Sequence, residues 1–134
     1  RDPRLARQQA DEFAARTRAG HRLLFFPEGT STDGRRVLPF KPTLFQAFLD
    51  PDLPPGLAIQ PVSVRYHAPS GRAPGFYGWW GDMALGPHLL SVLAQPRQGH
   101  VTVTLHPPIP VAGHDRKSLA AAAEAAVRSA APSA

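Results

Sequence analysis

The chain has 134 residues, a length that suits one domain. A hydrophobic fraction of 43% is enough for a modest core, and the absence of Cys excludes disulfides and thiol-ligated metals. The formal net charge of +5 favours anionic partners such as phosphate-bearing lipids, a membrane surface, coenzyme phosphates or nucleic acid, with a generic basic surface as the alternative. No apolar run approaches the roughly 20 residues that a membrane-spanning helix needs.

The first half of the chain predicts a helix, a strand, a loop and a second helix. From Arg4 to Ala19, apolar residues share one helical face, and a glycine follows as the stop. Arg22 to Phe26 is a short apolar run between a glycine and a proline, which indicates a buried strand. Pro27 to Pro42 is polar and contains glycine, which is typical of a functional loop. Thr43 to Leu49 predicts a short amphipathic helix.

The second half predicts two strands that alternate with two helices. Leu57 to Tyr66 has the composition of a strand, but Pro61 lacks an N–H donor and therefore requires an edge, a bulge or a strand end. Pro87 to Ala94 predicts a helix, and the alternating, β-branched segment His100 to His106 predicts a strand. Asp115 is a candidate cap for a last helix that runs to about Ala130. This alternation predicts an α/β fold with a mostly parallel sheet flanked by helices.

The loop between the second predicted strand and the helix that follows is rich in aromatic residues. Phe76, Trp79 and Trp80 could form an apolar wall for an acyl chain or lie in a membrane interface, and ordinary core packing is the alternative. The histidines lie on loops and strand ends without a pattern that converges, so no metal site is expected.

The segment with the clearest chemistry is residues 23–45, LLFFPEGTSTDGRRVLPFKPTLF. In an open α/β sheet, ligand sites lie beyond the carboxyl ends of strands, which is where Glu28 is expected. Its carboxylate can accept hydrogen bonds from a substrate hydroxyl, and Gly29 lets the backbone approach a ligand closely. An isolated Pro-Glu-Gly would more simply be a turn with a solvated glutamate. The loop also offers hydroxyl donors and phosphate-binding cations: Thr30, Ser31, Thr32, Arg35, Arg36 and Lys41.

The string FPEGTSTDG followed by LPFKPTLF resembles the third conserved block of the lysophospholipid acyltransferases. Ile59–Ser63 (IQPVS) is similar to the fourth block, which accounts for the proline in that predicted strand, and Arg1 falls where the second block ends in Arg. Residues 77–83 and 87–90 resemble a bacterial branch that acylates lysophosphatidic acid and lyso-ornithine lipid. The resemblance implies a glycerol-phosphate acyltransferase-like fold in which residues 1–134 are the C-terminal part of a single domain, with its N-terminal part missing.

The resemblance also implies a reaction, in which a fatty acyl group moves from acyl-CoA or acyl-carrier protein to the hydroxyl of a lysolipid. Acyl-CoA or the carrier protein is then a co-substrate, and no other cofactor is expected. The implied place is the cytoplasmic face of the cell membrane, reached peripherally or through an anchor in the missing N-terminal part. The family's base is a histidine with an aspartate five positions later. None of the six histidines here has that partner, so we expect the catalytic pair upstream of Arg1 and no catalytic residue in this chain.

Carried over by position, Glu28, Gly29 and Thr30 would bind the head group of the acceptor and Arg1 its phosphate. Ser31 stands where many members that acylate glycerol phosphates have Arg, which favours a lyso-ornithine acceptor, although Lys41 could supply a cation instead. The alternatives are a non-catalytic module that binds anionic lipid, and an unrelated transferase or hydrolase with a similar loop. Nucleic acid is not an expected partner, because the predicted strands do not interleave aromatic and basic residues.

Overall fold

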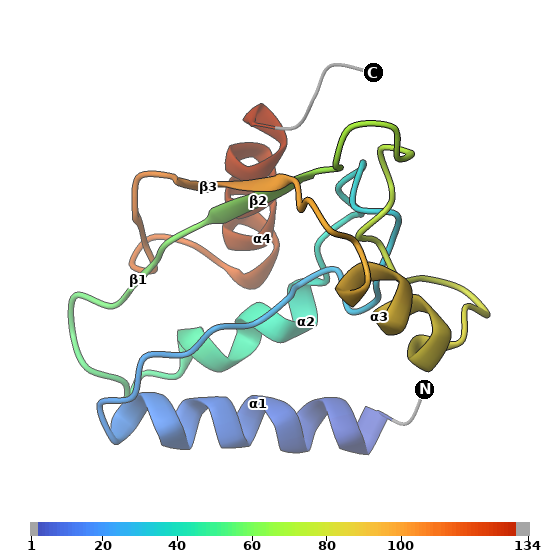
Figure 1. Cartoon of the computed structure of the whole chain (residues 1–134). Helices are drawn as coiled ribbons and strands as arrows, with labels where there is room; N and C mark the ends of the chain where they lie inside the picture. Colours follow the sequence, from blue (N-terminus) through green and yellow to red (C-terminus); the bar gives the residue numbers. More distant parts are fainter. Residues whose placement is uncertain (1–2, 131–134) are drawn as a thin grey trace.

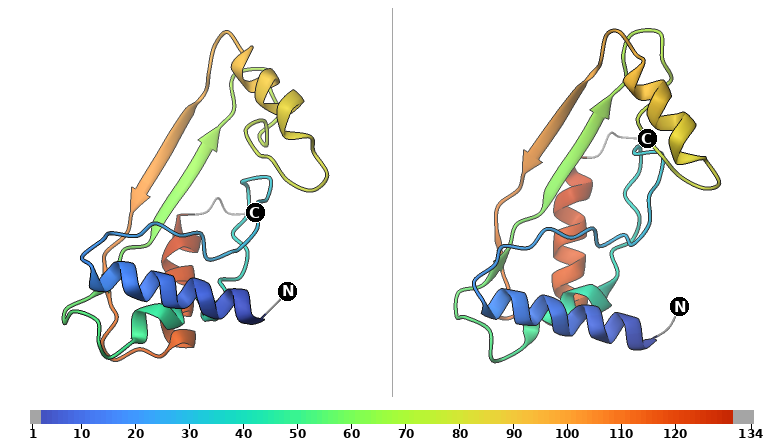
Figure 2. Two further views of the ribbon diagram at one scale, coloured as in Figure 1. Left: turned by 90° about the horizontal axis from the view of Figure 1, so that it is seen from below. Right: turned by 60° about the horizontal axis from the view of Figure 1, so that its bottom comes forward.

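The computed structural model describes residues 3–130, with the backbone alone at positions 3–7, 9 and 10. Most helices gather at one end of this part of the chain, two long strands extend from them, and one helix lies at the far end of these strands (Figures 1 and 2). The elements in chain order are α1 (Pro3–Arg18), α2 (Pro42–Phe45), the 3₁₀-helix η1 (Gln46–Leu49), β1 (Ala58–Ile59), β2 (Val62–His67), α3 (Leu85–Leu93), β3 (His100–Leu105), β4 (Ile109–Pro110) and α4 (Arg116–Ser129).

The ends of α1 and the start of α4 lie where the sequence predicts them, whereas α3 begins at Leu85 rather than at Pro87 and the helix predicted over Thr43–Leu49 is divided into α2 and η1. Helix α1 stops at Gly20, which adopts a φ of 81° and donates its N–H to the carbonyl of Thr17 at 3.0 Å. Helix α4 begins with a capping box, because the Asp115 carboxylate accepts the N–H groups of Lys117 and Ser118 while the Ser118 hydroxyl accepts the N–H of Asp115. The predicted cap is therefore confirmed.

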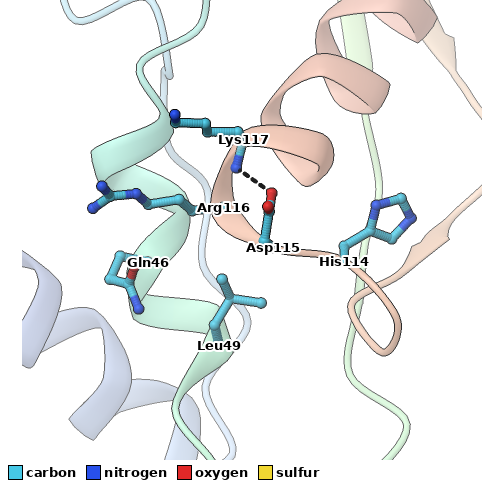
Figure 3. A pocket seen from close by; sticks show the side chains of 6 residues that line it. All are labelled: Gln46, Leu49, His114, Asp115, Arg116 and Lys117. Atoms are coloured by element: carbon cyan, nitrogen blue, oxygen red, sulfur yellow. Dashed lines mark hydrogen bonds between the residues drawn. The ribbon is translucent and has the colours of Figure 1, made fainter.

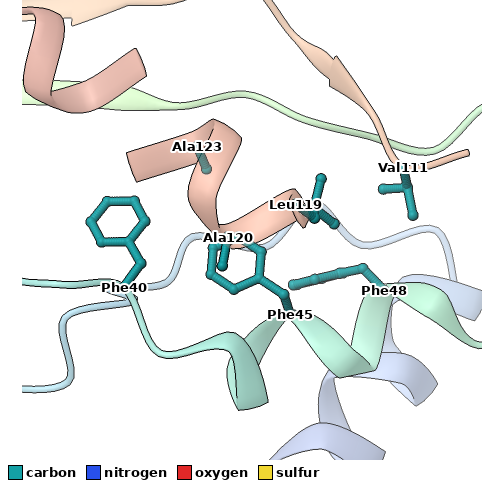
Figure 4. Close-up of a cluster of buried hydrophobic side chains, with 7 residues drawn as sticks. All are labelled: Phe40, Phe45, Phe48, Val111, Leu119, Ala120 and Ala123. Carbon is teal, nitrogen blue, oxygen red and sulfur yellow. The ribbon is translucent and has the colours of Figure 1, made fainter. Parts of the chain in front are cut away.

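The core lies where α2 and η1 pack between α1 and α4 (Figure 4). Phe45 and Leu119 are 1% and 0% exposed, and the ring of Phe25 lies 5.3 Å from that of Phe48. The small side chains on the inner face of α4 allow the helix to approach the aromatic rings closely. The buried members of the cluster are Phe40, Phe45, Phe48, Val111, Leu119, Ala120 and Ala123.

The strands described here pair in antiparallel fashion, so the mostly parallel sheet is not confirmed. β2 pairs with β3 from Val62 opposite Leu105 to His67 opposite His100, and β1 pairs with β4. Parallel pairing would require the connection between β2 and β3 to cross over the sheet. Helix α3 instead lies beyond the end of this pair (Figure 2), so the chain returns in the opposite direction.

Pro61 separates β1 from β2, as the sequence predicts for a proline within this segment. The carbonyl of Pro61 still accepts the N–H of His106 at 3.0 Å. A hydrogen bond to the segment after β3 is therefore kept here, because it uses the proline carbonyl and not the missing N–H.

The segment Arg22–Phe26 differs from its prediction as a buried strand. It pairs with no other strand within residues 3–130. Leu23 and Phe25 pack on the core, whereas Leu24 and Phe26 are 79% and 77% exposed. The side chains thus alternate as in a strand, but a strand also needs a neighbour to satisfy its backbone groups. The prediction of complete burial was wrong.

Candidate functional site

The loop from Pro27 to Lys41 is closed at its base by hydrogen bonds. The N–H of Lys41 donates to the carbonyl of Pro27 at 2.9 Å, and the N–H of Gly29 donates to that of Phe26 at 3.2 Å. Across the loop, the N–H of Leu38 donates to Oε2 of the half-buried Glu28 at 2.8 Å. Glu28 therefore has a structural role that the sequence analysis did not predict, because its carboxylate joins the two sides of the loop.

Gly29 and Lys41, which are far apart in the loop, meet at this turn. Gly29 has a φ of 67°, a backbone conformation that residues other than glycine rarely adopt. An ideal Cβ at this position would lie 2.5 Å from Nζ of Lys41 and 3.3 Å from its Cδ. The side chain of Lys41 thus crosses directly over Gly29, which places its ammonium group beside the turn that carries Glu28.

The tip of the loop presents hydroxyl groups and charges to solvent. Thr30 and Ser31 are exposed. The Thr32 hydroxyl and the Asp33 carboxylate each accept, at 3.2 Å, the backbone N–H of the residue two positions further on. Asp33 also lies 4.0 Å from the guanidinium of Arg36, a pair too exposed to contribute much stability. These contacts shape the tip and leave Thr30 and Ser31 accessible.

The far side of the loop is fixed to α4. The N–H of Phe40 donates to Oε2 of Glu124 at 2.9 Å, and Nε of Arg128 donates to the other carboxylate oxygen at 2.7 Å. The Phe40 bond, with a smaller contribution from Arg128, holds the pKa of Glu124 below its usual value against the opposing effect of burial. The last residues of the loop are therefore held on a helix rather than left in solvent.

The aromatic segment packs against the tip of this loop. An ideal Cβ at Gly78 would lie 2.9 Å from the carbonyl oxygen of Asp33 and 2.8 Å from the ring of Trp80. Trp79 and Trp80 are themselves 41% and 38% exposed, so ordinary core packing does not describe them. The structure thus brings an exposed aromatic surface next to the loop that carries Glu28.

The predicted binding residues fall into three groups. Glu28, Gly29 and Lys41 meet at the base of the loop, whereas Thr30 and Ser31 lie on its exposed face. Arg1 lies outside the described residues.

A shallow depression lies at the start of α4 (Figure 3), and no residue of this loop lines it. Its lining residues are Gln46, Leu49, His114, Asp115, Arg116 and Lys117. The Asp115 carboxylate is occupied as the helix cap, and the bonds from Ser118, followed by that from Lys117, hold the pKa of Asp115 below its usual value. We assign no binding role to this depression, because its carboxylate already serves the helix.

The sequence analysis did not predict a pair formed by the half-buried Ser63 and the buried His106. The Ser63 hydroxyl lies 2.7 Å from Nε2 of His106 and 3.2 Å from the carbonyl oxygen of Val127. His106 is only 8% exposed, so a substrate has little access to this pair. Its contacts join β2 and the end of β3 to α4, which is a structural role. No signal within one strand could have shown that these two residues meet.

Two further features are absent from residues 3–130. This part of the chain contains no group of three or more side chains able to hold a metal ion. None of its helices has the length and apolar character to cross a membrane.

Comparisons with known proteins agree with one another. The sequence model of the Acyltransferase family matches residues 1–65. The lyso-ornithine lipid O-acyltransferase of Rhodobacter capsulatus is 57% identical over 96% of this chain and 47% of its own length. The enzymes of the same name from Brucella abortus and Pseudomonas aeruginosa are 40% and 38% identical, over 90% and 95% of this chain and 48% and 46% of their own lengths. The chain thus spans about half the length of these curated relatives. No solved structure matches it.

The region matched by the family model includes the whole loop from Pro27 to Lys41. The similarity to the relatives continues through α3 and α4, because it covers nearly all of this chain. The resemblance first seen in the loop therefore extends along the sequence. By these matches the chain belongs to the lysophospholipid acyltransferase family.

Proposed function

We propose that this chain supplies the acceptor-binding part of an enzyme that transfers a fatty acyl group to the hydroxyl of a lysolipid. The observation that supports this most directly is the turn at Glu28 and Gly29, with the side chain of Lys41 lying over it. A carboxylate and an ammonium group carried by the same turn can together bind a polar head group that carries both charges. The exposed hydroxyls of Thr30 and Ser31 add neutral hydrogen-bonding groups.

A lyso-ornithine lipid is the acceptor that this arrangement fits best. The three relatives compared above are named as lyso-ornithine lipid O-acyltransferases. Ornithine has an amino cation and a carboxylate, so Glu28 would bind the first and Lys41 the second. Ser31 adds no further cation, which agrees with an acceptor that carries no phosphate monoester.

In the proposed reaction, the acceptor hydroxyl loses its proton as its oxygen bonds to the acyl carbon. The bond between that carbon and sulfur breaks, and the thiol of coenzyme A or of acyl-carrier protein leaves. The base is a His–Asp pair outside this chain, because none of the histidines here has an aspartate at the family's spacing. The residues of this chain bind and orient the acceptor for that base.

The setting of the reaction is part of the same proposal. The chain is the C-terminal part of one domain and acts at the cytoplasmic face of the cell membrane, peripherally or through an anchor in another part of the protein. A strand from that other part would pair with Arg22–Phe26, whose exposed Leu24 and Phe26 have the alternation of an incomplete strand. A strand that runs parallel to Arg22–Phe26 would supply the parallel pairing that the described strand pairs lack.

Acyl transfer by the whole protein tests the proposal. We expect lyso-ornithine lipid to be acylated with a higher kcat/KM than lysophosphatidic acid. Lys41→Met should lower kcat/KM for lyso-ornithine lipid about tenfold or more, the usual scale for losing one charged contact to a substrate. Lys117→Met is the matched control, because Lys117 is the only other lysine of the chain and lies in the depression at the start of α4, which no residue of the loop lines. Equal activity of both variants and the wild type would rule out the assigned role of Lys41.

A non-catalytic module that binds anionic lipid is the second candidate, and the net charge of +5 favours it. Binding by charge alone should collapse when the salt concentration rises. Salt-sensitive binding to anionic vesicles, together with no acyl transfer by the whole protein, would support this candidate over the enzyme.

A further inference from the structure

The surface of α3 is apolar although the helix is almost entirely exposed. None of its residues is buried, and Leu90 and Leu93 are 67% and 69% exposed. Leu85, Leu89 and Leu93 recur every four residues, so they line one side of the helix, with Leu90 beside them. The segment before the helix extends this surface with Trp79, Trp80 and Met83, all of which are exposed. We call these seven residues the α3 patch.

Hydrogen bonds, rather than burial of these side chains, hold α3 in place. Gln98 donates from Nε2 to the carbonyl of Val92 at 2.9 Å and accepts from the Tyr77 hydroxyl at 2.8 Å. Arg72 donates to Gln95, just beyond the helix, at 2.9 Å. The leucines of the patch, which are about half exposed or more, thus leave much apolar surface that the described fold does not cover, and such a surface indicates a partner.

The composition of the patch fits the surface of a lipid bilayer. Tryptophan favours the boundary between lipid tails and head groups, and the indole of Trp79 already has its hydrogen bond, to the carbonyl of Met83 at 2.7 Å. Over residues 69–99, Arg72 and Arg97 provide positive charge, and Asp82 is the only acidic residue. An apolar helix with basic neighbours is typical of segments that lie in the interface of anionic membranes.

The position of the patch agrees with this role. Figure 2 shows α3 at the end of the β2–β3 pair that lies away from α1 and α4, so nothing in the described part of the chain covers it. The aromatic segment of the patch contacts the Glu28 loop through Gly78 and the carbonyl of Asp33. A bilayer bound to the patch would therefore lie beside that loop and the exposed side chains of Arg35 and Arg36.

We propose that the α3 patch docks the chain on an anionic phospholipid bilayer, with the leucines and tryptophans entering the interface and the arginines facing the lipid phosphates. This docking does not require acyl transfer. Vesicle binding is measured without acyl donor or acceptor, so its failure would leave the proposed reaction standing.

The experiment uses the full chain and vesicles of phosphatidylcholine, alone or mixed with phosphatidylglycerol. Both tryptophans of the chain lie in the patch, so their fluorescence reports its environment without a label. We expect a blue shift and co-flotation with the mixed vesicles, and weaker binding to phosphatidylcholine alone. Leu89→Ser combined with Leu93→Ser should weaken binding at least tenfold, because each leucine loses a favourable transfer from water.

Val101→Ser combined with Val103→Ser is the matched control, because both valines are at least half exposed and lie on β3, outside the patch. The control should bind vesicles like the wild type. Circular dichroism should show native helix content in both double variants, and Leu90→Ser serves as a milder second variant. If the patch variants bind as well as the wild type, or the control loses as much binding, the docking surface is wrong. Wild-type fluorescence that stays unchanged with vesicles and shifts only when another part of the protein is added would assign the patch to a protein contact instead.

Discussion

Replacing Glu28 by Ala should loosen the loop as well as remove a binding group. The carboxylate accepts the N–H of Leu38 at 2.8 Å, and this bond joins residues ten positions apart. A hydrogen bond to a charged group contributes about 1.5–3 kcal/mol, and Glu28 is only half-buried, so we expect a loss of about 1.5 kcal/mol in the free energy of unfolding. For a chain of this size that corresponds to a fall of about 5 °C in Tm.

Glu28→Gln separates the charge from the hydrogen bond. Its side-chain carbonyl can still accept the N–H of Leu38, so we expect a loss of about 0.5 kcal/mol, and this variant is the better probe of binding in a transfer assay. Urea unfolding measures the stability of both variants, and hydrogen exchange at the Leu38 amide reports the bond itself. Unchanged exchange in Glu28→Ala would refute the structural role, and equal losses in both variants would show that the charge matters rather than the bond.

Three further predictions concern stability. Leu119 is 0% exposed, so Leu119→Ala should lower the free energy of unfolding, measured by urea denaturation, by about 3 kcal/mol. Leu24→Ala, at a side chain that is 79% exposed, is the control and should have little effect. The pKa of Asp115 is lowered in the folded chain, so its stabilising contribution is present above its ordinary value of 3.8 and is lost as the pH falls through the folded pKa. Asp115→Asn should reduce this acid sensitivity of Tm, and an unchanged acid profile would contradict the assignment. The pKa of His67 is lowered by partial burial and then by the charge of His100, whose ring lies 4.0 Å away. The free energy of unfolding should therefore fall as the pH drops below about 6.5, the ordinary pKa of histidine. His67→Asn should make this fall smaller, which the urea concentration at the midpoint of unfolding, measured at several pH values, would show.

The candidate site could be predicted in part because much of it is contiguous in the sequence. Glu28, Gly29, Thr30 and Ser31 follow one another, so a motif is enough to place them together. The position of Lys41 over Gly29 depends on the backbone closing the loop, as does the bond from Leu38 to Glu28. The contact between the aromatic segment and Asp33 joins segments more than forty positions apart, and no local pattern indicates it.

The sequence by itself determined where the helices lie and, for α1 and α4, where they end or begin. A helix satisfies most of its hydrogen bonds within one segment, so the glycine after α1 and the capping box before α4 could be recognised locally. A strand satisfies its bonds through a neighbour that lies elsewhere in the chain. For this reason only the tertiary structure decided that β2 and β3 run antiparallel and that Arg22–Phe26 remains without a partner in the described part of the chain. The exposure of α3 was also decided at this level, because the same apolar pattern would suit a helix buried in a core.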